Sequence, residues 1–225
     1  MIRLVYLARR NPELSHEAFV GRWRNHYRLA ASMKEWGTVR KYLQCEVKHD
    51  RNNPPYDGMA TVEYMTPDSR FANRGATEYH RILREDELRV FASHVSNFSC
   101  IATHEVVWGV GAAPAKIVRF LVKSGGLDAQ TFMERWKGPY AEKVVNSVHG
   151  LIGYARNVPI APEAGTSWGL KIDGAEELWF ESEEAALAYA NSAEAAALRA
   201  SAAELVASVT EMVTDEVVLH DVGNG

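Results

Sequence analysis

The chain of 225 residues has only two cysteines, Cys45 and Cys100. Two thiols cannot form the disulfide framework of a small secreted domain, and their separation is not one that metal-binding motifs use. Both cysteines fall in expected strands, away from any helix N-terminus that would lower a thiol pKa, so a nucleophilic role is disfavoured. A reducing, cytoplasmic location is the expectation that fits best.

Long apolar runs are lacking too. No segment approaches the roughly 20 apolar residues that a membrane-spanning helix needs. The apolar run within residues 1–10 is interrupted by Arg3 and closed by Arg9 and Arg10, which makes it too short for the core of a signal peptide. The sequence therefore predicts no membrane partner.

An excess of positive charge is also missing, because 25 lysines and arginines face 29 aspartates and glutamates. The net charge of −4 provides no basic field that would gather nucleic acid. Glycine-rich phosphate-binding motifs and the HExxH pattern are absent, so we expect neither a nucleotide cofactor nor a metal. Most histidines are scattered, at His16, His49, His80, His94, His104, His149 and His220.

The sequence does contain an internal repeat. Residues 19–27, FVGRWRNHY, recur as residues 132–140, FMERWKGPY. At 100° per helical residue, His26 falls on the same narrow face as the Phe and the Trp of this motif. The second copy has Pro139 at that position. The first copy thus places an ionisable group on an inward face, whereas the second keeps only the packing residues.

The first repeat reads as strand, helix, strand, strand, helix, strand. Ser15 is a good N-cap with Glu17 in the first turn, and the prolines within residues 51–55 cannot continue a strand. We expect strands at residues 2–9, 39–47, 59–65 and 97–107, a helix from Ser15 to about residue 36, and helical stretches within residues 67–89 and 87–95.

The second half follows the same order after a short Gly/Ala/Pro link at residues 109–114. Its alanine-rich run, residues 183–207, is a strong helix former. The correspondences that support the repeat are Phe120 with Tyr6, Lys123 with Arg9, Asp128 with Ser15, Tyr154 with Tyr42, Asp173-Gly174 with Asp57-Gly58, and Glu216-Val217-Val218 with Glu105-Val106-Val107.

Each βαββαβ unit forms a four-stranded antiparallel sheet with both helices on one face. Two such sheets can cover each other's bare faces and form a barrel with the helices outside. The predicted fold is therefore α+β, with two ferredoxin-like repeats, residues 1–111 and 112–225, fused into one α+β barrel. A pocket is expected between sheet and helices or in the barrel mouth, lined by aromatic residues such as Tyr6, Tyr64, Phe98 and Trp108.

A set of residues in the first repeat carries a family resemblance: Leu14, Ser15, Glu17, Phe19, Trp23, His26, Tyr27, Tyr42, Asp57-Gly58, Val62-Glu63-Tyr64, Asp86-Glu87 and Phe91. Together they resemble an EthD-type domain of the dimeric α+β barrel superfamily, and the resemblance extends over nearly the whole chain, once per half. It implies a pocket for a small, largely apolar, often aromatic molecule. Relatives include lactone isomerases, polyketide cyclases, decarboxylases, quinone-forming monooxygenases, haem-dependent enzymes and accessory proteins, so the fold does not select the chemistry.

The resemblance also implies that His26 and Asp86 are the polar pair of the pocket. The second copy aligns Pro139 and Ala203 with them, so both polar positions are lost together. A joint loss is expected if the two residues act as a pair and only one site is kept. The alternatives are a core histidine bonded to a carbonyl and an aspartate that caps a helix beginning at the next residue.

Such a pair has a definite chemistry. Imidazole titrates near neutrality, so His26 could move a proton on a phenol or an activated carbon while Asp86 fixes its tautomer. Hydrogen bonds to an oxyanion or phenol could come from Tyr27, Tyr42, Gln44 and Tyr64. The expected substrate-binding residues are Trp23, Tyr6, Tyr42, Tyr64 and Phe91.

Three functions stay open. The leading hypothesis is a cofactor-independent isomerase, cyclase, lyase or decarboxylase that acts on a small hydrophobic molecule of aromatic or polyketide type. The second is a non-catalytic accessory protein that binds such a molecule in a catabolic pathway. The third is a haem- or oxygen-dependent monooxygenase in which His26 or His94 reaches the iron. A homodimer of the barrel is left open as well.

Overall fold

The computed structural model describes residues 1–47, 56–73, 75–109 and 113–223. Three expectations lie outside these described residues, namely the proline turn at 51–55, His49, and the repeat boundary at 111/112, which stays a prediction. No helix within the described ranges is both long and apolar enough to cross a membrane.

The expected order of elements in the first repeat is confirmed. The Ser15 hydroxyl caps the first helix by accepting a hydrogen bond from the Ala18 backbone N–H. That helix ends at Ala31, and a 3₁₀ turn takes up the chain as far as Thr38. The elements are β1 (Ile2–Ala8), α1 (His16–Ala31), η1 (Lys34–Thr38), β2 (Val39–Glu46), β3 (Gly58–Tyr64), η2 (Pro67–Phe71), α2 (Thr77–Val90), η3 (Val95–Asn97) and β4 (Ser99–Gly109).

The second repeat has the same strand order but a more divided set of helices. Pro139 lies in a π-helical turn, as expected for a residue that has no backbone N–H to donate to the preceding turn. The elements are β5 (Ala115–Lys123), α3 (Ala129–Arg135), η4 (Trp136–Tyr140), α4 (Ala141–Ser147), β6 (Leu151–Pro159), β7 (Gly174–Phe180), α5 (Glu183–Ala190), α6 (Ala193–Ser201) and β8 (Val206–Asp221).

The alanine-rich run is not one helix. It divides at Asn191 and Ser192, and the Ser192 hydroxyl accepts a hydrogen bond from the Ala195 N–H to begin α6. Helix α6 ends at Ser201, and the last residues of the run already belong to strand β8, which begins at Val206. A side chain that can cap a helix competes with the helix interior, and here it outweighs the propensity of alanine.

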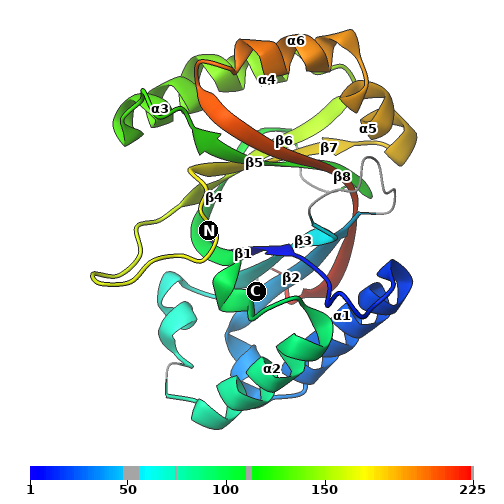
Figure 1. Cartoon of the computed structure of the whole chain (residues 1–225), viewed down its shortest axis with the longest axis vertical. Coiled ribbons are helices and arrows are strands. Elements are labelled where there is room, and N and C mark those ends of the chain that lie inside the picture. Colours follow the sequence, from blue (N-terminus) through cyan, green and yellow to red (C-terminus); the bar gives the residue numbers. More distant parts are fainter. Residues whose placement is uncertain (48–55, 74, 110–112, 224–225) are drawn as a thin grey trace.

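The eight strands close into one antiparallel barrel in the order β1-β3-β2-β8-β5-β7-β6-β4. Each repeat contributes a four-stranded sheet, and the two seams are the pairs β2 with β8 and β4 with β6. Helices α1 and α2 cover the outside of the first sheet, and α3 to α6 cover the second on the opposite side (Figure 1). The predicted fold class, two ferredoxin-like repeats in an α+β barrel, is confirmed.

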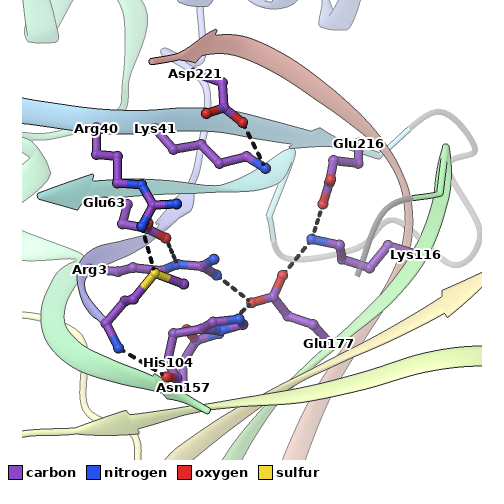
Figure 2. A network of polar contacts seen from close by, with 11 residues as sticks. Arg3, Arg40, Lys41, Glu63, His104, Lys116, Asn157, Glu177, Glu216 and Asp221 are labelled. Carbon is purple, nitrogen blue, oxygen red and sulfur yellow. Dashed lines mark hydrogen bonds and ion pairs between the residues drawn. The ribbon is translucent and has the colours of Figure 1, made fainter. Parts of the chain in front are cut away.

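Strand alternation sends side chains either into the barrel or outward to the helices. The interior holds an apolar cluster around Leu7, Met59 and Phe120. It also holds the network of charged groups in Figure 2, where Lys116 contacts both Glu177 and Glu216. The outer face of the first sheet instead packs on α1 and α2 through an aromatic layer of Tyr6, Phe19, Trp23, Trp36, Tyr42 and Phe91.

Strand pairing corrects the expected match of Tyr6 with Phe120. The β1 residue opposite the first glycine of β3 is Ala8, and the β5 residue opposite the first glycine of β7 is Leu121. Tyr6 therefore corresponds to Arg119. A shift of one residue reverses the face of a strand side chain, so Tyr6 faces the helices while Phe120 lies inside the barrel.

Two further correspondences shift in the same way. Lys123 matches Arg10 and not Arg9. The backbone N–H of Arg10 donates to Asp57, and that of Lys123 donates to the equivalent Asp173. Glu216 matches His104 instead of the following residue, as the pairing of β4 with β1 and of β8 with β5 requires. In each case a chemically similar residue lies one position away from the structurally equivalent one, so the expected match was wrong by one residue.

Candidate active site

A cavity of about 220 Å³ lies between the outer face of the first sheet and the helices that cover it. It is larger than the roughly 150 Å³ apolar cavity known to admit benzene, so a small aromatic ring fits. Aromatic side chains dominate the wall, namely Tyr6, Tyr27, Trp36, Tyr42, Tyr64 and Tyr79. Of the two places expected for a pocket, the space between sheet and helices holds this cavity.

His26 lies on the inward face of α1 and lines the cavity. Its Nδ1 is 2.8 Å from Oδ2 of Asp86, and its ring meets Phe91 edge to face at 5.6 Å. Only 11% of the side chain is exposed. Among the described residues no hydrogen bond engages Nε2, so this nitrogen is available to a bound molecule. The expected contact between His26 and Asp86 is present.

Asp86 approaches His26 from α2. The hydrogen bond from His26 lowers the pKa of Asp86, and the charges of His26, Arg89 and Arg22 act in the same direction. The carboxylate thus stays ionised beside the ring. Asp86 lies well inside α2, so the alternative that it caps a helix beginning at the next residue is wrong.

A hydrogen-bonded cluster of phenols forms the floor of the cavity. The Tyr6 and Tyr42 hydroxyls are 2.9 Å apart, Trp23 Nε1 donates to Tyr6 at 2.8 Å, and Gln44 Nε2 donates to Tyr42 at 2.9 Å. Each phenol already accepts one bond, and the pair shares one of its two protons. Among the described residues the second proton has no acceptor, so it can be donated to a ligand.

Burial keeps these phenols neutral. It raises the pKa of Tyr42 to about 12 and that of Tyr6 well above its ordinary value. Tyr27 is different, because its hydroxyl donates to the Leu219 carbonyl at 2.7 Å while its ring stacks on Tyr42. Tyr27 therefore shapes the wall, and the Tyr6 and Tyr42 hydroxyls are the hydrogen-bonding groups of the floor.

The expected substrate-binding residues divide into two groups. Tyr6, Tyr42 and Tyr64 line the cavity. Trp23 and Phe91 are absent from its wall and pack behind it, where Trp23 fixes Tyr6 and Phe91 supports His26. Two other expected aromatic residues also lie off the wall. Phe98 packs on Tyr6 and lines a second cavity, of about 310 Å³, together with Leu7 and Phe120 of the barrel interior. Trp108 is 43% exposed at the end of β4, so its expected place in the pocket is wrong.

The far end of the cavity was not anticipated from the sequence. It is formed by Arg70, Asn73, Tyr79 and His80, together with Leu83 on the first turns of α2. His80 Nε2 donates to the Asn73 carbonyl at 2.8 Å. The helical spacing of Tyr79 and Leu83 was a usable signal. Arg70 lies in the short 3₁₀ turn η2 and Asn73 follows it, so neither belongs to a periodic pattern.

The second repeat has lost the polar pair from the corresponding place, although a cavity of about 340 Å³ remains there. Pro139 replaces His26. The Leu205 carbonyl accepts from the first N–H after β5, as the Val90 carbonyl accepts from the chain after β1, so Leu205 corresponds to Val90. Counting back four residues from each makes Ser201 the counterpart of Asp86. The expected counterpart, Ala203, was displaced by two residues because the α6 helix ends earlier. Both ionisable groups are therefore absent from the second copy, but the expected loss of both polar side chains is only half right, because Ser201 keeps a hydroxyl.

A buried carboxylate takes over the role of the phenols there. Trp136 Nε1 and the Tyr154 hydroxyl both donate to Oε1 of Glu176, at 2.8 and 2.7 Å. Arg119, in the position of Tyr6, lies 3.8 Å from Oε2 of the same glutamate. A buried ion pair and its hydrogen bonds thus stand in the second copy where the first copy has the hydrogen-bonded phenols.

The site offers little to a metal or a haem. The described residues contain no group of three or more histidine, cysteine or acidic side chains placed to hold a metal ion. A haem exceeds most drug-sized ligands, whose pockets span roughly 300–1,000 Å³, whereas this cavity measures about 220 Å³. His94 is outside its wall, with Nδ1 3.0 Å from Glu87 Oε2. The haem alternative therefore does not fit these residues.

Both cysteines are buried in strands and free, as expected for structural thiols. Burial raises the pKa of Cys45 to about 12 and that of Cys100 to about 12. Such thiols stay protonated at neutral pH, which leaves no thiolate nucleophile at these positions.

Comparison with known proteins gives one family match and several structural ones. Residues 11–94 match the model of the EthD domain. No protein of curated function matches the chain in sequence. The matched segment includes His26 and Asp86 and ends shortly after Phe91, so it spans most of the cavity wall.

Three solved structures share the fold. A protein of Fusobacterium nucleatum, described as a candidate monooxygenase, is 8% identical with a TM-score of 0.58, covering 100% of this chain and 95% of its own. Another of that description, from Lactobacillus acidophilus, is 9% identical with a TM-score of 0.52, covering 96% and 94%. A chlorite dismutase variant from Candidatus Nitrospira defluvii is 10% identical with a TM-score of 0.54, covering 96% and 90%. At such identities the likeness concerns the fold alone.

Proposed function

Because residues 11–94 match the model of the EthD domain, we propose that the protein is a small-molecule enzyme that uses His26 as a general acid and base without a bound cofactor. Its substrate is a hydrophobic molecule of aromatic or polyketide type. The observation that carries the proposal is the hydrogen bond between His26 and Asp86 at the wall of an aromatic cavity.

The reaction begins at Nε2 of the neutral imidazole. This nitrogen takes a proton from a phenol or from a carbon next to a carbonyl, which leaves an imidazolium and a phenolate or enolate. The Asp86 carboxylate accepts the hydrogen bond of Nδ1–H, so it orients the ring and stabilises the imidazolium. The same Nε2–H then returns the proton to a different atom, which completes an isomerisation or a cyclisation. In a decarboxylation the carboxylate leaves as CO₂ and the proton goes to carbon.

The phenols of the floor support the charge that develops on the substrate. A Tyr6 or Tyr42 hydroxyl with one unshared proton can donate to an enolate or phenolate oxygen. In a water-poor cavity such a donor stabilises the anion more strongly than it would in solution. Since Trp23 and Gln44 fix both phenols from behind, the donor is held in place before the substrate arrives.

An oxygen-dependent reaction of the same deprotonated substrate is a second candidate. It is favoured by the description of two structural neighbours as candidate monooxygenases. The first step, proton removal by His26, is common to both candidates. Oxygen uptake during turnover separates them, because isomerisation, cyclisation and decarboxylation consume none.

The test is proton exchange in D₂O. A panel of small aryl ketones and phenols is incubated with the protein, and deuterium entry at carbon is followed by NMR with oxygen uptake recorded in parallel. We expect exchange that His26→Ala slows by about 10²–10⁴-fold, the contribution typical of a positioned acid–base group. His149→Ala is the matched control, because His149 is exposed in the second repeat.

Two outcomes would count against the proposal. Exchange at the wild-type rate in a well-folded His26→Ala variant would show that the imidazole moves no proton. Tight binding of panel members without exchange, product or oxygen uptake would instead support a protein that binds such molecules without turning them over.

A further inference from the structure

Arg70 is the one arginine among the described residues that line the cavity. It lies on η2, directly after the Thr66 cap whose hydroxyl accepts a hydrogen bond from the Ser69 N–H. The guanidinium lies over the Phe71 ring at 4.2 Å. Its Nε is buried and has no hydrogen-bond partner. A buried donor without an acceptor costs free energy that a bound acceptor restores.

Nothing else on the described wall neutralises this charge. No described carboxylate lies within ion-pair distance of Arg70. Glu87, the acidic residue of the wall, is already engaged, because its Oε2 accepts from the Val95 N–H at 3.2 Å and contacts His94 Nδ1 at 3.0 Å. The charge of Arg70 acts on Tyr64, and burial raises the pKa of both Tyr64 and Tyr79 to about 12, so these two phenols of the wall are neutral. The cavity therefore has an uncompensated positive end.

The second repeat shows what this position becomes when the site is lost. Ser182 caps α5 as Thr66 caps η2, with its hydroxyl accepting from the N–H three residues on. Counting from these caps, Arg70 corresponds to Ala186, which is fully buried in the apolar core of the second repeat. The arginine is thus absent from the copy that also lacks the histidine and the aspartate.

The positive end is separated from the reacting end along β3. Ala60 pairs with Tyr6, and Tyr64 lies four residues further along the same face, at about 13 Å by strand geometry. His26 and Tyr6 both pack on Phe91, whereas Arg70 lies near Tyr64. A molecule held by both ends therefore spans the cavity.

We propose that Arg70 binds a carboxylate of the substrate at the end of the cavity opposite His26, so that the enzyme acts on small aromatic or polyketide-type acids. This inference rests on the cavity of the proposed function, but it concerns recognition and needs no turnover. The planar fork of a guanidinium matches the two oxygens of a carboxylate, which makes an acid the chemical class that this group selects. The other end of such a molecule lies beside His26 and the Tyr6–Tyr42 pair.

A matched pair of probes tests the charge preference. Binding of 4-hydroxybenzoate and of 4-hydroxybenzamide, which differ in charge but little in shape, is measured by calorimetry on the full chain. We expect the wild type to bind the acid at least about tenfold more tightly, as for a hydrogen bond to a charged group. Arg70→Leu should bind both probes equally, and Arg70→Lys should keep part of the preference.

The controls separate recognition from catalysis. Arg81→Leu is the matched substitution, because Arg81 pairs with Glu78 and Glu85 on the exposed side of α2, and it should keep the preference. His26→Ala should also keep it, even while proton exchange is lost. Equal binding of the two probes by the wild type, binding of neither, or an unchanged preference in Arg70→Leu would each overturn the assignment. Should the leucine variant fold poorly, Arg70→Gln gives the same comparison.

Discussion

At the scale of residues, the two repeats differ where chemistry is needed and agree where packing is needed. Phe19 and Trp23 stack in the first copy at 5.1 Å, and their counterparts Phe132 and Trp136 stack in the second at 5.6 Å. His26, by contrast, has become a proline. A duplicated chain thus provides an internal comparison, which is why the sequence alone could single out His26.

The polar pair gives a prediction for the rate of turnover. In Asp86→Asn the imidazolium loses its stabilising carboxylate, and the ring loses the acceptor that fixes its tautomer. We expect kcat to fall about 10²-fold, because no carboxylate then orients the ring or stabilises its charge during proton transfer. The measurement is kcat at neutral pH with a member of the panel that the wild type turns over.

Asp86→Glu distinguishes charge from position. It keeps the carboxylate, so it should retain more of the wild-type rate than Asp86→Asn does, even if the longer side chain lowers the rate. A wild-type rate in Asp86→Asn would contradict a carboxylate acting through His26. It would leave Asp86 with a packing role.

Arg70 shows the limit of sequence reasoning at this scale. His26 and Asp86 lie on long helices, where periodicity and a family pattern point to them. Arg70 follows a cap in a five-residue 3₁₀ turn, and its charge matters only because the folded chain leaves its Nε without a partner. Whether a buried donor finds a hydrogen-bond partner depends on the tertiary structure, so no local sequence pattern predicts it.

At the scale of elements, each repeat has a glycine at the point where its first helix meets the sheet. A Cβ added to Gly58 would lie 2.5 Å from the Cys45 carbonyl oxygen and 2.9 Å from the Trp23 ring. One added to Gly174 would lie 2.5 Å from the Trp136 ring. The Asp-Gly pair that signalled a strand start therefore also sets how closely the indole approaches the sheet.

This contact predicts different consequences in the two halves. Gly58→Ala and Gly174→Ala should each destabilise the protein by roughly 1–3 kcal/mol, the usual cost of overpacking, as measured by urea unfolding. Only Gly58→Ala displaces Trp23 from Tyr6, so only this variant should also weaken binding of 4-hydroxybenzoate at a temperature where both are folded. Equal binding by the two variants would show that Trp23 does not hold the floor of the cavity.

Element order was predictable from the sequence, whereas register was not. Caps, prolines and alternation located the strands and helices because those signals are local. The pairing of Tyr6 with its true counterpart depends on hydrogen bonds to a strand that is distant in sequence. Arg119 and Phe120 are adjacent in β5 and both are large, so residue type alone could not reveal an error of one position.

At the scale of the whole molecule, the barrel joins the repeats through charges as well as strands. Arg3 of the first repeat lies 3.0 Å from Glu63 and 3.2 Å from Glu177 of the second, and Lys116 contacts the same Glu177 (Figure 2). Burial alone would raise the pKa of Glu177, but the charges of Lys116 and Arg3 outweigh it and lower that pKa. The buried carboxylate of Glu177, in the second repeat, is thus partly neutralised by Arg3 of the first repeat.

His104 makes this interior sensitive to mild acid. Burial, aided by the charge of Arg3, lowers the pKa of His104 to about 4 from its ordinary value of 6.5. Between these values the unfolded chain binds a proton that the folded chain does not, so stability is lost as the pH falls. The pKa of Glu177 is also lowered, but the stability that depends on it is lost only as the pH approaches and falls below the ordinary glutamate value of 4.5. Between about pH 7 and pH 5 the effect of His104 can therefore be measured without that of Glu177.

Urea unfolding in that interval is therefore the measurement. From about pH 7 to pH 5 the histidine should cost the wild type about 2 kcal/mol of unfolding free energy, which His104→Gln should not lose because a neutral amide takes up no proton. His149→Gln, altered at an exposed site, should keep the wild-type slope. If His104→Gln retained the full pH dependence, the acid sensitivity would have to arise elsewhere, and the interior of the barrel would be accessible enough to solvate an imidazolium.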